Sequence, residues 1–373
     1  MESNKIEIEK DIVKFETDGY ITDPFSTKDI KISNAVISLA SLIDRLEYEE
    51  IDLNPDFQRH ANLWSPTNMS RLIESILLKL PLPIFYFDVS NPDKWIVVDG
   101  LQRLSTIKKF VVDKKLKLKN LEFLKELNDK SYDDLERNLK RIMDETQIVT
   151  YQIEAQTPKK VRYSIFNRIN TGGLSLNAQE IRQALNQQGN GIKFLEACAK
   201  EDIFKRIVKI SSKRMLDREL ILRFIAFKLT PTASQNFPYN NMGEFLDNSM
   251  ENLDKTDEET LKKLQKNLLE TLEFSEKVLG ENHHFSRSIA DNKRTNTLNR
   301  SLFDVITVCL SNINNKISFL NKKEKFKKRL IELLRNEQGD FFKAITEGTS
   351  SKGAIETRFR IMNQMIKEVI DED

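Results

Sequence analysis

The chain has 373 residues, of which 31% are charged and 39% are hydrophobic, and its formal net charge is +2. This length predicts one large domain or two ordinary ones. The small net charge excludes a protein that binds nucleic acid through a basic field over its whole surface, although local patches stay open. No stretch approaches the roughly 18 consecutive apolar residues of a membrane span. Residues 1–14 are charged and lack the apolar core of a signal peptide. We therefore expect a cytoplasmic protein without a membrane partner.

Cysteine and histidine are scarce, which excludes most zinc sites and most catalytic triads. Cys198 and Cys309 lie in apolar helical patterns without a CxxC neighbour. They are expected to be buried free thiols in a reducing compartment. The only histidines are His60 and the adjacent pair His283 and His284, and the pair lies in a polar stretch typical of a loop. We predict no metal site.

The pattern of strands and helices divides the chain. Strand signals stop near Ile153, whereas amphipathic helical patterns continue to Ile370. We therefore expect a mixed α+β domain followed by an all-helical domain, with a polar arm in front. Lysine, aspartate and glutamate dominate residues 113–145, where we expect an inserted helical excursion. The arm covers residues 1–30, the α+β domain residues 31–186 and the helical domain residues 187–373.

Capping signals fix several helix starts in the α+β domain. Ser65 precedes Pro66, which is the combination of an N-cap with proline at the first helical position. Thr157 is expected to cap a second helix, and Asn177 with Glu180 forms a capping box for a third. Helices are expected over 35–46, 66–80, 101–112 and 158–170, and strands over 84–89, 94–98 and 147–153. In the second half, helices are expected over 194–210, 217–228, 257–279, 298–313, 322–335 and 355–370.

Residues 97–105 are the most informative stretch. A β-branched strand passes through Asp99 and Gly100 into a segment with helical spacing. The free N–H groups at the start of a helix bind anions readily. Gln102 and Arg103 lie in the first turn, where they can donate further hydrogen bonds to a phosphate. The alternative is a plain strand, turn and helix with solvated polar residues.

Two further polar segments resemble this one in composition, since each joins an arginine to amides or glycines near a turn. Arginine and amide donors suit the recognition of planar groups and phosphates. If the three segments share a cleft, Arg59, Arg103 and Arg168 bring positive charge together, and either a bound anion or Asp56, Asp99 or Glu180 must balance it. The three segments are "PDFQR" at 55–59, "DGLQR" at 99–103 and "FNRINTGG" at 166–173.

These three segments in this order resemble the DGQQR-box family. This is a ParB-N-like domain found at the N-terminus of GmrSD-type restriction enzymes and related phage-defence proteins. The resemblance spans roughly residues 30–190 and continues through "RMLDRELILR" at 214–223. The far C-terminus resembles stand-alone members without an attached nuclease domain. The resemblance implies a ParB/sulfiredoxin-like fold with a pocket for a nucleoside triphosphate.

Family roles then transfer to matching positions. The resemblance places Asp99 and Arg103 at the reacting phosphates, where Asp99 would orient Mg²⁺ or water and Arg103 would stabilise phosphate charge. The resemblance implies defence or restriction against foreign DNA. The remaining implied nucleotide-binding residues are Gln58, Arg59, Gly100, Gln102, Arg168, Asn170, Gly172 and Gly173.

The sequence departs from the family in two respects. Leu101 replaces the first glutamine of the box and cannot donate a hydrogen bond. The resemblance therefore supports nucleotide hydrolysis less strongly than nucleotide binding. The helical half also lacks the His-Asn nuclease signature of the long members, which predicts that a separate nuclease or other defence subunit acts as partner. We weigh a triphosphatase, a non-catalytic nucleotide-gated switch that binds DNA or a partner, and an inactive scaffold.

DNA contact is the weaker expectation. Two lysine-rich stretches are present, but a solvated helix face is the better explanation for each. They comprise Lys108, Lys109, Lys114, Lys115, Lys117 and Lys119, and residues 322–329.

Overall fold

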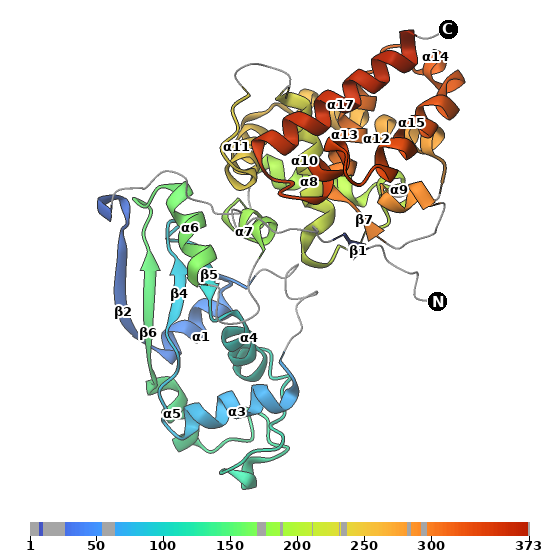
Figure 1. Ribbon diagram of the computed structural model, residues 1–373. Helices are drawn as coiled ribbons and strands as arrows, with labels where there is room; N and C mark the ends of the chain where they lie inside the picture. Colours follow the sequence, from blue (N-terminus) through green and yellow to red (C-terminus); the bar gives the residue numbers. More distant parts are fainter. Residues whose placement is uncertain are drawn as a thin grey trace. The chain divides into compact units, whose positions relative to one another are not determined.

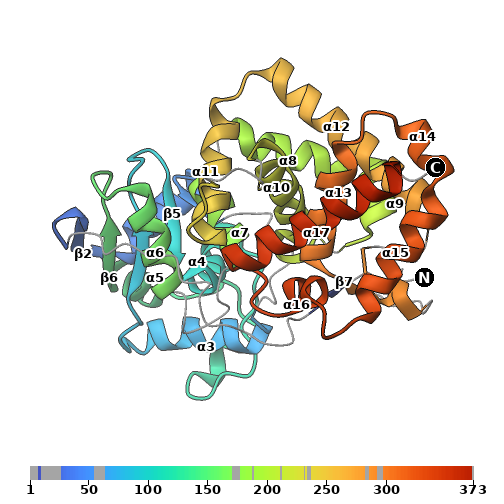
Figure 2. The same ribbon diagram turned by 45° about the horizontal axis from the view of Figure 1, so that its top comes forward.

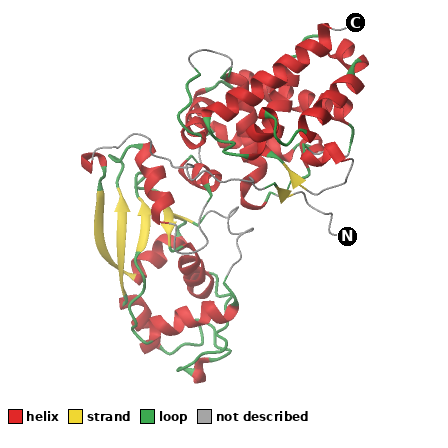
Figure 3. Ribbon diagram, in the orientation of Figure 1, coloured by secondary structure: helices red, strands yellow, loops and turns green. Residues whose placement is uncertain are grey.

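The computed structural model describes residues 7–9, 27–53, 64–169, 177–186, 189–210, 212–230, 232, 237–281, 285–291 and 297–371. Contacts divide the chain into two compact units. Residues 23–185 form the box unit, named for the polar segments it contains. Residues 1–22 and 186–373 form the helical unit. The sheet lies in the box unit and long helices dominate the other (Figure 3), so the predicted α+β class is confirmed.

The box unit is built on a five-stranded mixed sheet in the order β2-β6-β4-β5-β3 (Figure 1). Strand β2 is antiparallel to β6, and β4 is antiparallel to β5, as expected for the predicted hairpin. Strand β4 is parallel to β6, and β3 is parallel to β5. The strand bounds are β2 Ile32–Ser38, β3 Ile51–Asp52, β4 Phe85–Asp88, β5 Trp95–Asp99 and β6 Gln147–Ile153.

One face of the sheet contributes to an apolar core with helices α1 (Leu39–Glu47), α3 (Pro66–Leu77) and α4 (Leu101–Ile107). Phe85 and Phe87 of β4 are fully buried in this core. Burial of such a side chain stabilises the fold by about 1.5–3 kcal/mol. Helix α4 continues directly into a π-helical turn, Lys108–Val112.

Helix α6 (Lys159–Ile169) is held to the sheet by an ion pair. The Asp88 carboxylate at the end of β4 is fully buried and accepts from Nη1 of Arg162 at 3.1 Å. The same Arg162 nitrogen donates to the Ser90 hydroxyl at 2.5 Å. A buried carboxylate needs such partners because desolvation penalises its charged form. The pair therefore fixes the helix that carries Arg168 of the third polar segment.

Several local predictions are confirmed. Ser65 caps α3 by accepting from the N–H of Asn68 at 3.2 Å, with Pro66 as the first helical residue. The capping box of α7 (Ala178–Leu185) is complete: Asn177 Oδ1 accepts from Glu180 N at 2.9 Å, and Glu180 Oε2 accepts from Asn177 N at 2.7 Å. Strand β6 has the predicted bounds.

One other local prediction is wrong. The helix expected from residue 35 begins only at Leu39, because residues 32–38 pair with β6 along their whole length. Long-range pairing thus overrides the local signal there. The Thr157 hydroxyl accepts from the N–H of Lys31 and donates to the carbonyl of Lys31, both at 3.0 Å, and its role as the cap of the next helix stays a prediction.

The predicted helical excursion is mostly irregular. Between residues 113 and 136 the regular structure is one short 3₁₀ turn, Lys125–Leu127, and helix α5 follows at Arg137–Glu145. The segment is held from α3 by the buried Glu74 carboxylate. It accepts from the backbone N–H groups of Glu122, Phe123 and Leu124 at 3.1, 2.7 and 2.8 Å. The Glu74 carboxylate thus accepts from three backbone N–H groups that would donate to backbone carbonyls if this segment were helical.

The helical unit has one continuous apolar core. Helices α13 and α17 lie side by side within it (Figures 1 and 2). The predicted helix over 194–210 is two helices that meet at Glu201, and α11 was not predicted. The main helices are α8 Asn190–Lys200, α9 Asp202–Val208, α10 Leu216–Leu229, α11 Met242–Lys255, α12 Glu258–Leu279, α13 Arg300–Ser311, α14 Lys316–Asn321, α15 Lys323–Arg335, α16 Asp340–Thr346 and α17 Lys352–Asp371.

The N-terminal arm contributes to this unit. Strand β1 (Glu7–Ile8) pairs in parallel with β7 (Thr297–Leu298). The sequence predicts an all-helical domain here, and this prediction is wrong at the β1–β7 strand pair. Cys198 and Cys309 are buried free thiols as predicted. Within the described residues, no helix combines the length and apolarity needed to cross a membrane.

Candidate nucleotide-binding site

The central polar segment forms a tight turn between a buried strand and a helix. Strand β5 ends at Asp99, and Gly100 has φ 105° and ψ 7° before α4 begins at Leu101. A side chain is disfavoured in this left-handed region. A Cβ at Gly100 would also lie 2.4 Å from Cδ1 of Phe85. The glycine is thus required by the backbone and by packing inside the protein.

The Arg103 side chain is held at this turn by hydrogen bonds within the protein. Its side chain is 10% exposed, and Nη2 donates to the Ile84 carbonyl at 3.0 Å and to Asp99 Oδ2 at 3.1 Å. Nη1 donates to the Pro83 carbonyl. Burial lowers the pKa of Arg103 and the adjacent Asp99 opposes that effect, but an arginine stays charged in proteins. Asp99 therefore balances the charge of Arg103, which was one of the two alternatives that the sequence left open.

Gln102 connects the central segment to Trp64. Its side-chain Oε1 accepts from the backbone N–H of Trp64 at 3.2 Å. Trp64 follows the "PDFQR" segment closely in the chain. With Oε1 used in this way, the amide of Gln102 presents its NH₂ group as a donor. The structure thus brings Trp64 to the second segment, a contact that the sequence could not place.

Asp99 is the accessible acid at this turn. Its side chain is 44% exposed. Oδ2 binds Arg103, and Oδ1 accepts no hydrogen bond within the part of the chain that the structure describes. Carboxylate oxygens are the ligands that Mg²⁺ prefers in proteins. The donor set at the turn, which combines helical N–H groups with one carboxylate, fits a metal-bound triphosphate.

The other predicted site residues are only partly described. Arg168 lies in the last turn of α6 and its side chain is exposed. Five predicted residues, Gln58, Arg59, Asn170, Gly172 and Gly173, lie outside the described residues, as do His60, His283 and His284. Whether Arg59 and Arg168 share a cleft with the Asp99 turn stays a prediction.

The residues that sequence analysis missed are the partners of Arg103. Phe85 and the carbonyls of Pro83 and Ile84 come from the start of β4. Phe85 begins β4, whereas Arg103 lies on α4, which directly follows the antiparallel strand β5, and only the hairpin register places them together. The one available signal was the predicted hairpin itself, which carries no information about the rotamer of Arg103.

Comparison with known families now identifies the unit. Residues 39–187 match the family model described as the GmrSD restriction endonuclease N-terminal domain. This segment belongs to that family. The match includes the Asp99 turn, helix α6 and the capping box of α7 in one GmrSD N-terminal domain. No curated protein and no solved structure matches the chain significantly, so the finer likeness to ParB and sulfiredoxin stays a prediction.

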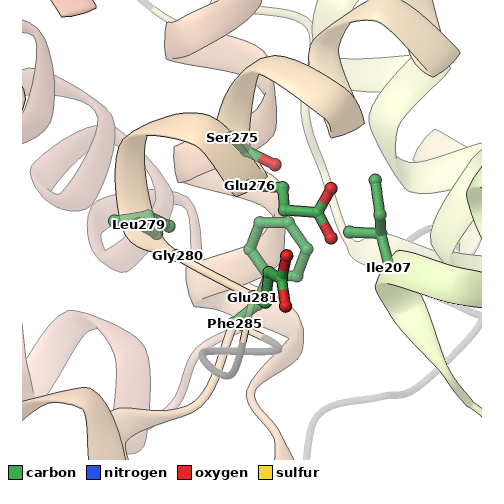
Figure 4. A pocket seen from close by; sticks show the side chains of 7 residues that line it. All are labelled: Ile207, Ser275, Glu276, Leu279, Gly280, Glu281 and Phe285. Carbon is green, nitrogen blue, oxygen red and sulfur yellow. The ribbon is translucent and has the colours of Figure 1, made fainter.

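The helical unit holds a small hollow of its own. It is lined by residues of α9 and α12 and of the segment after α12, among them Ile207, Glu276 and Glu281 (Figure 4). The Glu276 carboxylate is engaged by Nη1 of Arg206 at 2.5 Å. Apolar lining atoms and carboxylates do not suit a phosphate. Among the described residues, no group of three or more His, Cys, Asp or Glu side chains is arranged to hold a metal ion.

The lysine-rich stretch beside the turn is partly neutralised. Lys108 pairs with Asp113 at 2.8 Å, and Lys114 pairs with Asp133 at 2.7 Å. These exposed pairs contribute little stability, but they reduce the local positive charge. DNA binding by this stretch stays a prediction.

Proposed function

We propose that this chain is a nucleoside triphosphate-binding component of a restriction-type defence system against foreign DNA. The observation that carries the proposal is the family match over residues 39–187, which encloses the turn at Asp99 and Gly100. The matched family is named for a restriction endonuclease, and the match concerns its N-terminal domain. The defence context follows from the family, and the nucleotide from the chemistry of the turn.

The turn offers suitable groups for a triphosphate with Mg²⁺. The first N–H groups of a helix have no partner within that helix, and the first helical bond here runs from Leu104 N to the Gly100 carbonyl. The N–H groups ahead of it can donate to phosphate oxygens, joined by the side-chain NH₂ of Gln102. Asp99 would hold the metal ion through Oδ1. A bound Mg²⁺ would neutralise phosphate charge.

Two observations favour binding over rapid hydrolysis. Arg103 already donates to two carbonyls and to Asp99, so its guanidinium is held by the protein. Leu101 cannot supply the donor that the box usually places there. Catalysis requires groups that bind the transition state more strongly than the ground state. A nucleotide-gated switch that binds DNA or a partner is therefore the second candidate, and a separate nuclease subunit would cut the DNA.

Titration of the full chain with each triphosphate, with and without Mg²⁺, tests binding. We expect Gln102→Ala and Asp99→Asn each to weaken binding by about tenfold or more, as for loss of a charge-assisted hydrogen bond. Gln147→Ala is the control, because Gln147 is exposed at the start of β6, which is separated from β5 by β4. Equal affinity in all three variants, or no affinity in the wild type, would remove the proposed site.

Phosphate release from the same samples separates the two candidates. A triphosphatase releases phosphate in many turnovers and loses this activity with Asp99→Asn. A switch binds the nucleotide but releases little phosphate, and its conformation changes with the nucleotide. Limited proteolysis with and without nucleotide detects that change.

A further inference from the structure

The helical unit holds the N-terminal segment in a dedicated position. Glu7 and Ile8 form a parallel pair with Thr297 and Leu298, and the N–H of Glu9 donates to the Leu298 carbonyl at 2.8 Å. Ile8 packs against the apolar core of this unit. A two-residue ladder is too short to be stable without further contacts. Side-chain contacts must therefore supply the rest of the attachment.

Those contacts converge on the Glu9 carboxylate, which is 7% exposed. Oε1 accepts from the Ser286 hydroxyl at 3.0 Å and from the backbone N–H of Arg287 at 3.1 Å. Oε2 accepts from Nε of Arg287. Longer contacts of 3.3 Å come from the Thr297 hydroxyl and the Asn299 side chain. Donors on both sides of the carboxylate satisfy a buried charge that would otherwise be costly.

The helical unit keeps these donors in place through contacts of its own. The Asn299 side chain caps α13 by accepting from Leu302 N at 2.8 Å, and its Nδ2 donates to the Ile345 carbonyl at 2.9 Å. The Arg287 guanidinium carbon lies 5.8 Å from the centre of the Phe342 ring. We therefore expect the donor set to persist when the N-terminal segment leaves.

We propose that the β7 edge, together with Ser286, Arg287 and Asn299, is a docking site for an extended peptide that carries a glutamate. Its occupant is the N-terminal segment of this chain. Addition of a strand to an open edge supplies main-chain hydrogen bonds, and a side-chain pocket supplies specificity. Here the pocket accepts a carboxylate one residue after the paired strand. The attachment is short and polar, so it can exchange with the same segment added as a separate peptide.

The test uses the full chain with the N-terminal segment released from the docking site. Glu9→Ala removes the carboxylate but leaves every donor in place. We expect a fluorescent peptide of residues 1–12 to bind the Glu9→Ala chain at least about tenfold more tightly than the wild-type chain, whose own segment competes. Glu259→Ala serves as the matched chain control, because Glu259 is an exposed glutamate in the same unit. It should behave as the wild type does.

Peptide variants define what the site recognises. A peptide with Glu9→Ala should bind the Glu9→Ala chain about tenfold more weakly than the native peptide, and Glu9→Gln should fall between the two. Hydrogen exchange at the backbone amide of residue 9 should accelerate in the Glu9→Ala chain, whereas the overall circular dichroism stays unchanged. No peptide binding up to about 1 mM, or equal binding of all peptides, would overturn the proposal.

Discussion

The guanidinium carbon of Arg103 lies 4.1 Å from the centre of the Phe85 ring. The same ring lies where Gly100 would carry a side chain. One aromatic residue of β4 therefore determines both the glycine of the turn and the position of the arginine. Because cations are attracted to the faces of aromatic rings, this contact directs Arg103 into the protein. The arginine of the box therefore supports the turn.

Arg103→Ala is expected to destabilise the box unit. The change removes the stacking on Phe85 and leaves the carbonyls of Pro83 and Ile84 without their donor. Loss of a buried hydrogen-bond network of this kind costs about 2–4 kcal/mol in the free energy of unfolding. Urea unfolding followed by circular dichroism measures the loss.

The contrary outcome is equally specific. If Arg103→Ala keeps the wild-type stability but abolishes triphosphate binding, the arginine acts on the ligand, as the family resemblance implies. Arg103→Lys refines the comparison, since lysine keeps the charge but cannot donate in the same fork to two carbonyls and a carboxylate. We expect it to recover only part of the stability.

Gly100→Ala should be destabilising by about 2–4 kcal/mol, because it combines a left-handed backbone with a contact of 2.4 Å to Phe85. The matched control is Gly353→Ala on α17, where no atom lies within 4 Å of the added Cβ. That control should be neutral or stabilising by up to about 1 kcal/mol, as for glycine in a helix. Equal melting temperatures for the two variants would contradict the packing argument.

Local chemistry made part of this fold predictable. The Ser65 cap and the Asn177 and Glu180 capping box involve residues three positions apart, so the sequence contains both partners. The strand β6 follows from a run of β-branched and aromatic residues over seven positions. The Asp99 turn is predictable for the same reason, since a β-branched strand, a glycine and a helical period follow one another directly.

Long-range contacts explain what could not be predicted. Strand β2 was expected to be helical in part, and it is a strand because Ala35 pairs with Thr150 in a ladder that spans 115 residues of chain. The sequence could indicate Asp99 as a partner of Arg103, but it could not indicate the Pro83 and Ile84 carbonyls, which lie about twenty residues away in the chain. Glu74 looks like an ordinary polar residue of an amphipathic helix until residues 122–124 reach it.

Glu74 should make the stability of the box unit depend on pH. Burial raises the pKa of Glu74. Hydrogen bonds from the N–H groups of Leu124, Phe123 and Glu122, together with the nearby Arg71, lower this pKa by more than burial raises it, so the net shift is downward. A lowered pKa in the folded state gives stability that is present above the unfolded value of about 4.3 and is lost as the pH falls through the folded value. We therefore expect unfolding free energy to fall steeply below about pH 4.

Glu74→Gln isolates this effect. The variant should be less stable than the wild type at pH 7, by about 2–3 kcal/mol, and should lose less stability between pH 5 and pH 3. Glu122→Gln is the control, because Glu122 is an exposed partner of Arg71 on the same segment, and no measurable change is expected. Parallel pH profiles for the wild type and Glu74→Gln would show that the three amides do not hold a charged carboxylate.

The helical unit contains a second buried charge whose removal should be costly. Asp304 of α13 is fully buried, and it accepts from Nε of Arg223 at 3.0 Å and also from Nη2 of that arginine. Nη2 of Arg358 on α17 lies 3.7 Å from the same carboxylate. Burial lowers the pKa of Arg223, but Asp304 and Glu219 raise it more, so the net shift is upward. Asp304 of α13 thus forms ionic contacts with both α10 and α17.

Asp304→Ala should lower the unfolding free energy by about 3–5 kcal/mol, because it leaves the Arg223 charge buried without its counterion. The combined change Asp304→Leu with Arg223→Met removes the charge as well as its partner, and we expect it to be more stable than Asp304→Ala. Urea unfolding of the three proteins checks the order, with the exposed Glu259→Ala as the control that leaves stability unchanged. If Asp304→Ala and the double variant lose equal stability, the cost is lost packing, and the ionic contact between α10 and α13 contributes nothing of its own.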